Sequence, residues 1–336
     1  MKTKRVVWIV LSMLGVACVV AGSAASAWAQ AASTSSVQAF PTRPIRFILP
    51  FPPGGNTDIL GRIAGQKLSE RLGQPVVADN RAGLGGYLGL EITSKAAPDG
   101  YTITIASMVY ASGPLTYPHL KFNPERELVS IGQLSEAPNI VVVHPAVPAK
   151  SLKELVDYAR ANPKKLNYAT SGTGSTLHLA TAMLNRVGKM DVVHVPYKGG
   201  GGPAMNAVLG GEVQMIVLGP ASIPHVRSGK ARALAVLSEQ RITVAPDVPT
   251  AKEQGYDVVV TSWHGLMAPA GTPRAIVGRI NKEWVESAAG ADVRDRLEKL
   301  GFVPRPGTPD QFAAFLKEES RRWARLIKEV GIQPER

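Results

Sequence analysis

From residue 44 to the C-terminus, short apolar runs alternate with segments in which apolar residues recur every three or four positions. Short apolar runs are typical of strands, and the second spacing is typical of amphipathic helices. Glycine, proline or helix-capping residues separate most of these segments, so the chain predicts an α/β fold. We expect strands at residues 45–49, 75–79, 102–107, 129–134, 139–144, 166–171, 191–197, 213–219, 231–238 and 258–269. The clearest helices are expected at 58–72, 151–161, 175–187, 203–209, 273–289 and 309–330.

Two stretches repeat one layout of strand, glycine-rich turn and helix start. The first is FILPFPPGGNTDILGRIAGQKL, residues 47–68, and the second is LNYATS followed by GTGST and a helix that starts near Thr176. A helix N-terminus leaves backbone N–H groups unpaired, and its dipole favours negative charge. One glycine turn is usually only chain geometry. Two such turns facing one cleft would offer N–H groups and hydroxyls to a single anionic ligand.

The first 29 residues have a different character. A basic start, MKTKRVV, precedes the apolar stretch WIVLSMLGVACVVAG, and Ala27-Trp28-Ala29 before Gln30 has the small-x-small form of a signal-peptidase site. We therefore expect a signal peptide at 1–29, cleaved after Ala29, and a flexible leader at 30–43. An uncleaved anchor is the alternative, but the apolar stretch is short for a bilayer span. Cys18 is the only cysteine, so the exported chain would have no disulfide and no thiol nucleophile.

A chain of 336 residues is long for one hydrophobic core, so two lobes are expected. Hydrophobic residues make up 45% and charged residues 19%, which is typical of a globular protein, and no second long apolar run follows residue 29. The formal charge of +12 falls to +9 when Lys2, Lys4 and Arg5 leave with the signal. The remaining basic residues are scattered singly, without a run interleaved with aromatics, so we expect no nucleic-acid partner.

Eight motifs together resemble the Bug receptors, the substrate-binding components of tripartite tricarboxylate transporters. They follow one another in the same order from about Pro44 to the C-terminus: PIRFILPFPPGGNTDILGR, LGQPVVADNRAGLGGYLG, AAPDGYTI, LNYATSGTGSTLHLA, VVHVPYKG, GKARALAV, APDVPTAKEQGY and WHGLMAPAGTP. The resemblance implies a periplasmic-binding-protein fold of the type with two crossovers, each lobe a sheet flanked by helices. Lobe one would comprise 44–140 with 265–336 and lobe two 141–264, with hinges near 134–140 and 262–266.

The resemblance also implies where a ligand carboxylate is held, partly through ordered waters. The turn of lobe one would face the turn of lobe two, and these turns comprise Gly54, Gly55, Asn56, Thr57 and Asp58 on one side and Ser171, Gly172, Thr173, Gly174, Ser175 and Thr176 on the other. A further position that reaches the pocket in the family comprises Ser107, Met108, Val109 and Tyr110, which are mostly bulky and apolar here.

Family members often carry an aspartate near Leu218, where this chain has none. Its absence disfavours a cationic or amino-acid ligand and favours a monocarboxylate or dicarboxylate with an apolar or aromatic body.

Other candidates have both a binding and a structural interpretation. His178, in the first turn of the lobe-two helix, either donates to the ligand or packs locally. Lys198, which precedes the run of glycines from Gly199 to Gly202, either steers anions into the cleft or is simply solvated. Trp263 and His264 lie at the return crossover, where they line the cleft or pack at the hinge. The remaining histidines lack metal-ligand spacing, so we expect no metal.

Enzymatic alternatives have weaker support. AGLGGYLG, residues 82–89, is a near miss to a dinucleotide fingerprint, because its glycines fall at 83, 85, 86 and 89. GTGST lacks the G-x-S-x-G elbow of a serine hydrolase. We therefore expect a monomeric, non-enzymatic periplasmic receptor without cofactor. The resemblance implies that it delivers a small carboxylate to a large and a small membrane subunit. A sensor that presents its occupied form to a signalling protein remains the alternative.

Overall fold

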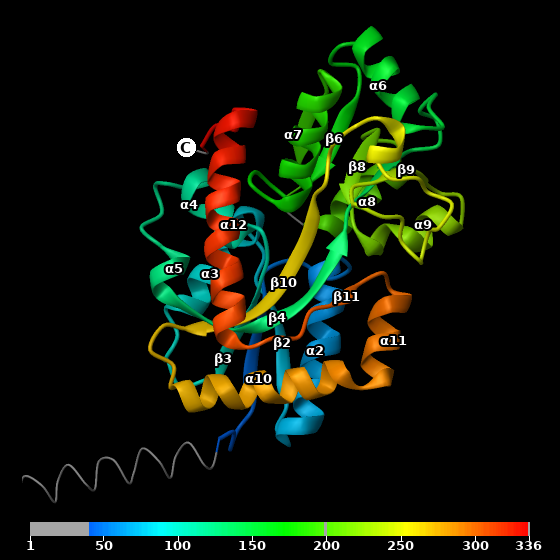
Figure 1. Ribbon diagram of the computed structural model, residues 1–336. Coiled ribbons are helices and arrows are strands. Elements are labelled where there is room, and N and C mark those ends of the chain that lie inside the picture. Colours follow the sequence, from blue (N-terminus) through cyan, green and yellow to red (C-terminus); the bar gives the residue numbers. More distant parts are fainter. Residues whose placement is uncertain (1–39, 198–199, 335–336) are drawn as a thin grey trace, which may run out of the picture. The chain divides into compact units, whose positions relative to one another are not determined.

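Two separate β-sheets, each flanked by helices, build the protein (Figure 1). The computed structural model describes residues 40–197 and 200–334. The chain from Arg43 onward is one unit, distinct from the N-terminal unit that ends at Thr42. The predicted signal peptide with its cleavage site after Ala29, most of the predicted leader, and both Lys198 and Gly199 lie outside the described residues.

The first sheet has six strands in the order β11-β4-β10-β3-β1-β2. β1 pairs in parallel with β2 and β3, whereas β10 is antiparallel to both β3 and β4, and β11 is antiparallel to β4. The strands span Ile45–Leu49 (β1), Val76–Asn80 (β2), Thr102–Ala106 (β3), Leu128–Pro138 (β4), Thr261–Pro269 (β10) and Val303–Pro304 (β11). β1 is almost wholly buried, which explains its continuous apolar sequence IRFIL.

The second sheet has five strands in the order β7-β6-β8-β5-β9. β6 is parallel to β7 and β8, and β5 is antiparallel to β8 and β9. The strands span Ile140–Val143 (β5), Asn167–Thr170 (β6), Val193–Pro196 (β7), Met215–Leu218 (β8) and Arg232–Val236 (β9). All four residues of β5 and of β8 are buried, so these two strands form the centre of this lobe.

Helices cover both sheets. In chain order they are α2 (Asn56–Leu72), α3 (Tyr87–Ser94), α4 (Val109–Thr116), α5 (Pro124–Glu127), α6 (Leu152–Ala161), α7 (Thr176–Gly188), α8 (Gly201–Leu209), α9 (Ile223–Arg227), α10 (Arg274–Ala289), α11 (Ala291–Lys299) and α12 (Pro309–Val330). Short 3₁₀ turns lie at Leu84–Gly86, Pro220–Ser222 and Lys252–Gln254.

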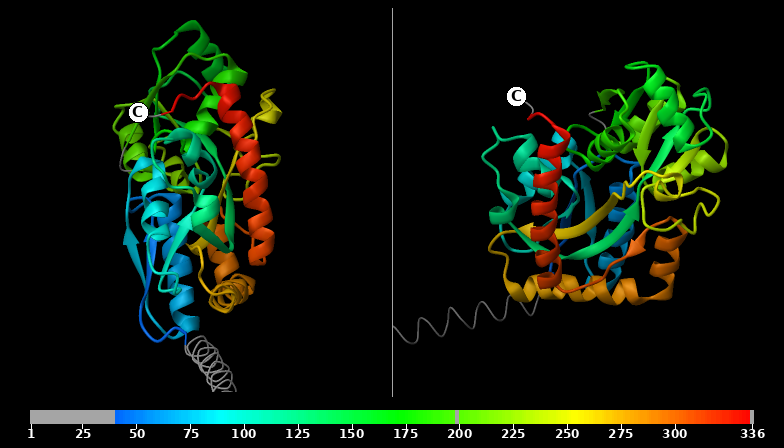
Figure 2. Two further views of the ribbon diagram at one scale, coloured as in Figure 1. Left: turned by 90° about the vertical axis from the view of Figure 1, so that its left-hand side faces the viewer. Right: turned by 45° about the horizontal axis from the view of Figure 1, so that its top comes forward.

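The chain crosses between the sheets twice, at the end of β4 and at the start of β10. These two long strands are paired with each other and run side by side (Figure 2). Asn139, between β4 and β5, is fully buried. Its amide donates to the carbonyl of Val260 at 2.8 Å and accepts from the Ser262 hydroxyl at 3.0 Å. One side chain therefore joins the two crossovers, where φ/ψ changes at a few residues could rotate one lobe against the other.

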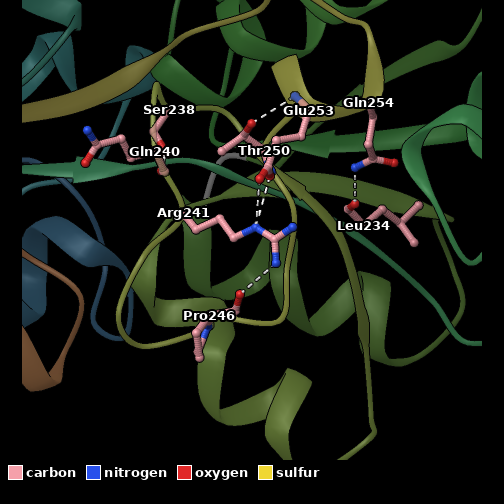
Figure 3. A network of polar contacts seen from close by, with 8 residues as sticks. All are labelled: Leu234, Ser238, Gln240, Arg241, Pro246, Thr250, Glu253 and Gln254. Carbon is pink, nitrogen blue, oxygen red and sulfur yellow. Dashed lines mark hydrogen bonds and ion pairs between the residues drawn. The ribbon is translucent and has the colours of Figure 1, made fainter.

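The segment between β9 and β10 has little regular structure and is held by polar contacts (Figure 3). Arg241 pairs with Glu253 at 3.0 Å and also donates to the carbonyl of Pro246. Glu253 and Thr250 bond reciprocally, and the Gln254 side chain donates to the Leu234 carbonyl on β9. These contacts fix the path along which the chain returns to the first sheet.

The architecture confirms the predicted α/β fold with two lobes and two crossovers. Each of the ten expected strands is present, with shifts at the ends; the strand expected at 129–134, for example, continues to Pro138. Each of the six clearest helices is also present. Sequence patterning did not identify β11, which has only two residues, or the short helices α3, α4, α5, α9 and α11.

Candidate functional site

The turn after β1 leads into α2 with a helix N-terminus that no side chain caps. Gly55 is the N-cap residue and has no side chain to accept a hydrogen bond. Asn56, Thr57 and Asp58 form the first helical turn, whose N–H groups have no acceptor within a helix. Gly54 has φ +96°, a conformation that favours glycine. The positive end of the α2 dipole and its free donors are thus directed at the space beyond the turn.

Asp58 holds this turn in place rather than facing the space beyond it. Its carboxylate accepts from the Gly54 N–H at 3.2 Å, from Asn80 at 3.0 Å and from Arg62 at 3.0 Å. Asn80 also donates to the carbonyl of Phe51 at 2.7 Å. Burial by itself would raise the pKa of Asp58, but the hydrogen bonds from Arg62, Asn80 and Gly54 outweigh it and hold that pKa below its ordinary value. Asp58 is therefore a charged brace for the turn.

The corresponding turn of lobe two satisfies most of its own donors. The Ser175 hydroxyl caps α7 by accepting from the His178 N–H and donates to the Gly172 carbonyl at 2.7 Å. The Gly174 N–H donates to Nδ1 of His178, and the Gly172 N–H donates to the Thr170 hydroxyl, each at 3.2 Å. The two turns share a layout but differ chemically, because only the lobe-one helix begins without a side-chain cap.

Lobe one contacts the lobe-two turn directly. The Ser112 hydroxyl on α4 donates to the Gly174 carbonyl at 2.6 Å, and the Tyr117 hydroxyl donates to the Thr173 carbonyl at 3.0 Å. Gly85 is close enough that an added Cβ would lie 2.9 Å from the Thr173 carbonyl oxygen. The lobes are therefore closed against each other along this edge.

Asn56 forms a second contact between the lobes. Its Oδ1 accepts from the N–H of Ala221 at 2.8 Å, and Ala221 belongs to the 3₁₀ turn that follows β8. An added Cβ on Gly219 would lie 2.4 Å from the Asn56 amide nitrogen, so the Asn56 side chain packs here only because Gly219 has no side chain. The first residue of α2 is in this way tied to lobe two.

Between these contacts lies a cleft with an empty volume of about 470 Å³, part of it open to solvent. Its described lining residues are Phe51, Gly55, Asn56, Thr57, Gly85, Ser107, Ser171, Thr176, Leu177, Gly201, Leu218, Ser262 and His264. Among them are several hydroxyls and amide groups, apolar side chains and one histidine, but neither a lysine nor an arginine. An anion in this cleft would be held by dipoles and hydroxyls.

The cleft brings together seven of the predicted site residues, namely Gly55, Asn56, Thr57, Ser107, Ser171, Thr176 and Leu218. The other described ones do not line it. Gly54 and Asp58 brace the lobe-one turn, and Gly172, Thr173, Gly174 and Ser175 shape the lobe-two turn. Met108 and Val109 are buried at the start of α4. Tyr110 lines a separate cavity with residues of α12 and stacks edge-on against Trp263.

His178 lies on the far side of the lobe-two turn. Its ring stacks on that of His194 at 4.1 Å, and both line a different cavity with residues of α7 and the C-terminal segment. Burial, with a smaller contribution from His194, lowers the pKa of His178 to about 3, so the ring is neutral at pH 7. Its accepted bond from Gly174 indicates a role in shaping the turn.

Side chains alternate between the two faces of β10, so Trp263 and His264, the two candidates at the return crossover, point in opposite directions. Ser262 and His264 line the cleft, whereas Trp263, between them, points toward α12 and donates its indole N–H to Glu319 at 2.9 Å. Glu319 also accepts from the indole of Trp323 at 2.8 Å. Trp263 thus packs against α12, and His264 is a cleft residue.

Sequence reasoning missed five lining residues: Phe51, Gly85, Leu177, Gly201 and Ser262. The run AGLGG around Gly85 was a usable signal, since three of its glycines have positive φ. The run resembles a dinucleotide motif, but in the structure Gly85 allows close approach to the other lobe.

Comparison with known proteins agrees with this architecture. Residues 60–332 match the model of the tripartite tricarboxylate transporter family receptor. BugT of Bordetella pertussis is 36% identical over 330 residues, which cover 96% of this chain and 98% of BugT. The structure of an R. palustris protein with adipate is 32% identical, covers 88% of this chain and 100% of its own, and has a TM-score of 0.86. MatC of Rhodopseudomonas palustris with bound malate is 34% identical, with 86% and 100% coverage and a TM-score of 0.82.

The chain therefore belongs to the tripartite tricarboxylate transporter receptor family, whose members are solute-binding proteins. The resemblance noted from the motifs is confirmed.

No helix in residues 40–197 and 200–334 has the length and apolarity needed to cross a membrane. The same part of the chain contains no group of three or more histidine, cysteine, aspartate or glutamate side chains suited to a metal ion.

Proposed function

We propose that the protein is a periplasmic receptor that binds a small carboxylate in the cleft between its lobes and presents it to the membrane subunits of a tripartite tricarboxylate-type transporter. The observation that carries this proposal is the uncapped N-terminus of α2, which lies at the cleft between the lobes. Its donors have no competing side chain, and the helix dipole favours an anion there. Adipate and malate in two structural relatives support the choice of a carboxylate.

Hydroxyls complete the carboxylate site. Thr57 lies in the uncapped turn itself, and Ser171 and Thr176 face it from lobe two. Hydrogen bonds to a charged group contribute roughly 1.5 to 3 kcal/mol each, and micromolar affinity needs about 8 kcal/mol. A few donors of this kind are therefore sufficient without a cationic side chain. Ordered water between donors and ligand would accommodate acids of different shape.

The body of the ligand is apolar or aromatic. Phe51, Leu177 and Leu218 supply apolar surface to the cleft, and no described lining residue carries an acidic group that could hold an ammonium. Monocarboxylates and dicarboxylates are thus preferred over amino acids. The proposed binding site comprises the residues that line the cleft and the two turns that shape the cleft.

The remaining parts of the proposal concern the chain as a whole. Residues 1–29 are an export signal removed after Ala29, and 30–43 are a leader. Lobe one comprises 44–140 with 265–336, and lobe two comprises 141–264. Large and small membrane subunits are the partners, and the receptor itself is a monomer without catalytic activity.

Isothermal titration of the exported chain with a panel of acids tests the proposal. The panel contains adipate, malate, benzoate, hexanoate, aspartate and glutamate. We expect micromolar or tighter binding of at least one of the first four acids and none of the two amino acids. Tight glutamate binding without a response to the other acids would contradict the proposed ligand class.

A matched pair of variants then locates the carboxylate. Thr176→Val removes a hydroxyl from the cleft lining, and we expect affinity to fall roughly 10- to 150-fold because one bond to a charged group is lost. Ser175→Ala removes the neighbouring hydroxyl that caps α7, and we expect about 1 kcal/mol lower stability with little change in affinity. The opposite result, with binding lost only in Ser175→Ala, would place the ligand elsewhere.

A further inference from the structure

His264 is the only ionisable side chain among the described residues that line the cleft. It lies on β10 and is 2% exposed. Its ring packs against Phe302, with the ring centres 6.1 Å apart and the planes at 74°. The strand is irregular immediately after it, where the register with β4 shifts between His264 and Gly265. Such bulges re-aim a side chain, and here the side chain at the bulge is the imidazole.

One nitrogen of the imidazole lacks a hydrogen-bonding partner. Nδ1 is buried and has no partner among the described residues. Ser262, its neighbour on the same face of β10, is different, because its hydroxyl is bonded to Asn139. Buried polar groups are nearly always paired, and an unpaired one in a cleft is explained when a ligand supplies the partner.

Charge limits what that partner can be. Burial lowers the pKa of His264 to about 4, so the ring is neutral at pH 7. The described lining contains no lysine or arginine. The α2 N-terminus can stabilise one carboxylate, but a second anionic group beside His264 would be desolvated without a counter-charge. A neutral imidazole offers one donor and one acceptor, and a hydroxyl can pair with either.

We propose that His264 recognises a hydroxyl group of the ligand, and that the cleft is therefore selective for hydroxy-substituted monocarboxylates. This inference rests on the proposed function, since it assumes that the carboxylate occupies the α2 end of the cleft. His264 is then the specificity-determining residue, whereas the turn of lobe one supplies affinity common to all acids.

Matched ligand pairs test this assignment by titration calorimetry at pH 7. The pairs are 4-hydroxybenzoate with benzoate and 6-hydroxyhexanoate with hexanoate, and adipate is the dicarboxylate probe. In the wild type we expect the hydroxy member of at least one pair to bind about 10- to 100-fold more tightly. His264→Phe should remove this preference, so that the two members of the pair bind with equal affinity. His225→Phe, on α9 and outside the cleft lining, is the matched control and should retain the preference.

A second variant and a proton measurement complete the test. His264→Asn keeps a donor and an acceptor and should retain part of the preference, which also decides the matter if His264→Phe does not fold. Titration in two buffers of different ionisation enthalpy should show no proton uptake with the hydroxy acids. Tightest binding of adipate, with uptake of a proton that His264→Phe abolishes, would overturn the hydroxyl assignment in favour of a second carboxylate.

The failures of the two proposals are distinguishable. Equal binding of both members of every pair by the wild type would overturn the role of His264 and leave the carboxylate receptor intact. Failure of all the acids to bind the wild type would overturn the proposed function itself.

Discussion

Gly85 is the point at which a single methyl group is expected to oppose closure of the lobes. It lies in the 3₁₀ turn Leu84–Gly86 with φ +62°. A Cβ added there would lie 2.9 Å from the Thr173 carbonyl oxygen and 3.5 Å from the Tyr117 hydroxyl. The nearest of these atoms is backbone, so it cannot rotate away as a flexible side chain can. Gly85→Ala therefore forces the two lobes apart along this edge.

The size of the effect follows from two contributions. The positive φ costs an alanine about 1 kcal/mol whether the lobes are open or closed, so it lowers stability but not affinity. The overlap with Thr173 arises only when the lobes are together, and crowding of this kind costs roughly 1 to 3 kcal/mol. Ligand that binds only the closed form should then bind about 5- to 150-fold more weakly.

The assay compares Gly85→Ala with Gly73→Ala by calorimetry and by urea denaturation. Gly73 ends α2 with φ +70° and has nothing within 4 Å of an added Cβ, so it reproduces the backbone cost without the overlap. We expect both variants to lose similar stability and only Gly85→Ala to lose affinity. Wild-type affinity in a folded Gly85→Ala protein, or an equal loss in Gly73→Ala, would refute the reasoning.

Three further predictions concern stability. Burial lowers the pKa values of His178 and His264 to about 3 and 4, so the unfolded chain binds more protons than the folded one as the pH falls through 6.5. The stability present above pH 6.5 should therefore fall by about 1.5 kcal/mol per histidine between pH 6.5 and 5, measured as urea midpoints. His264→Phe should lose its share of this slope, and equal stability at both pH values would contradict the expected neutral rings. Glu319→Leu leaves the indole N–H groups of Trp263 and Trp323 without an acceptor, so the free energy of unfolding should fall by roughly 1 to 3 kcal/mol for each indole. Tryptophan fluorescence during unfolding measures this loss. Glu319→Gln keeps an acceptor and should lower the free energy of unfolding less. Asp58→Ala removes the carboxylate that braces the lobe-one turn, so it should lower stability by about 1 to 3 kcal/mol and also weaken carboxylate binding. Unchanged binding in calorimetry would show that the turn keeps its shape without Asp58.

Regular elements could be predicted from the sequence because their patterns are local. The buried runs IRFIL and MIVL and the N-cap residue Ser151 of α6 each identify an element without reference to the rest of the chain. β11 escaped prediction because two residues carry no periodicity, and its pairing with β4 is set by tertiary structure. The start of α2 at Asn56 instead of Asp58 depends on a glycine N-cap, which is a weak signal.

The candidate site could be predicted only in part, for the same reason. Both glycine turns can be recognised in the sequence, but the hydrogen bonds that distinguish them cannot. The local sequence allows Ser175 and His178 either to face a ligand or to bond within their own turn, and the structure shows the second arrangement. Gly85 lies at the cleft because it packs close to the carbonyl of Thr173, which is 88 positions later in the chain. His264 required the strand register, which decides that it and not Trp263 faces the cleft.

The unequal capping of the two turns has a consequence for how the receptor tolerates change. In lobe two, the donors of the turn are engaged by its own side chains, so substitutions there should reduce the amount of intact protein in the cell. In lobe one, the first turn of α2 has no side-chain cap to lose, so substitutions there, other than those of the bracing Asp58, should leave the protein abundant but unable to support growth on its solute. A mutational scan scored for both abundance and growth should therefore separate the two turns into distinct phenotypic classes.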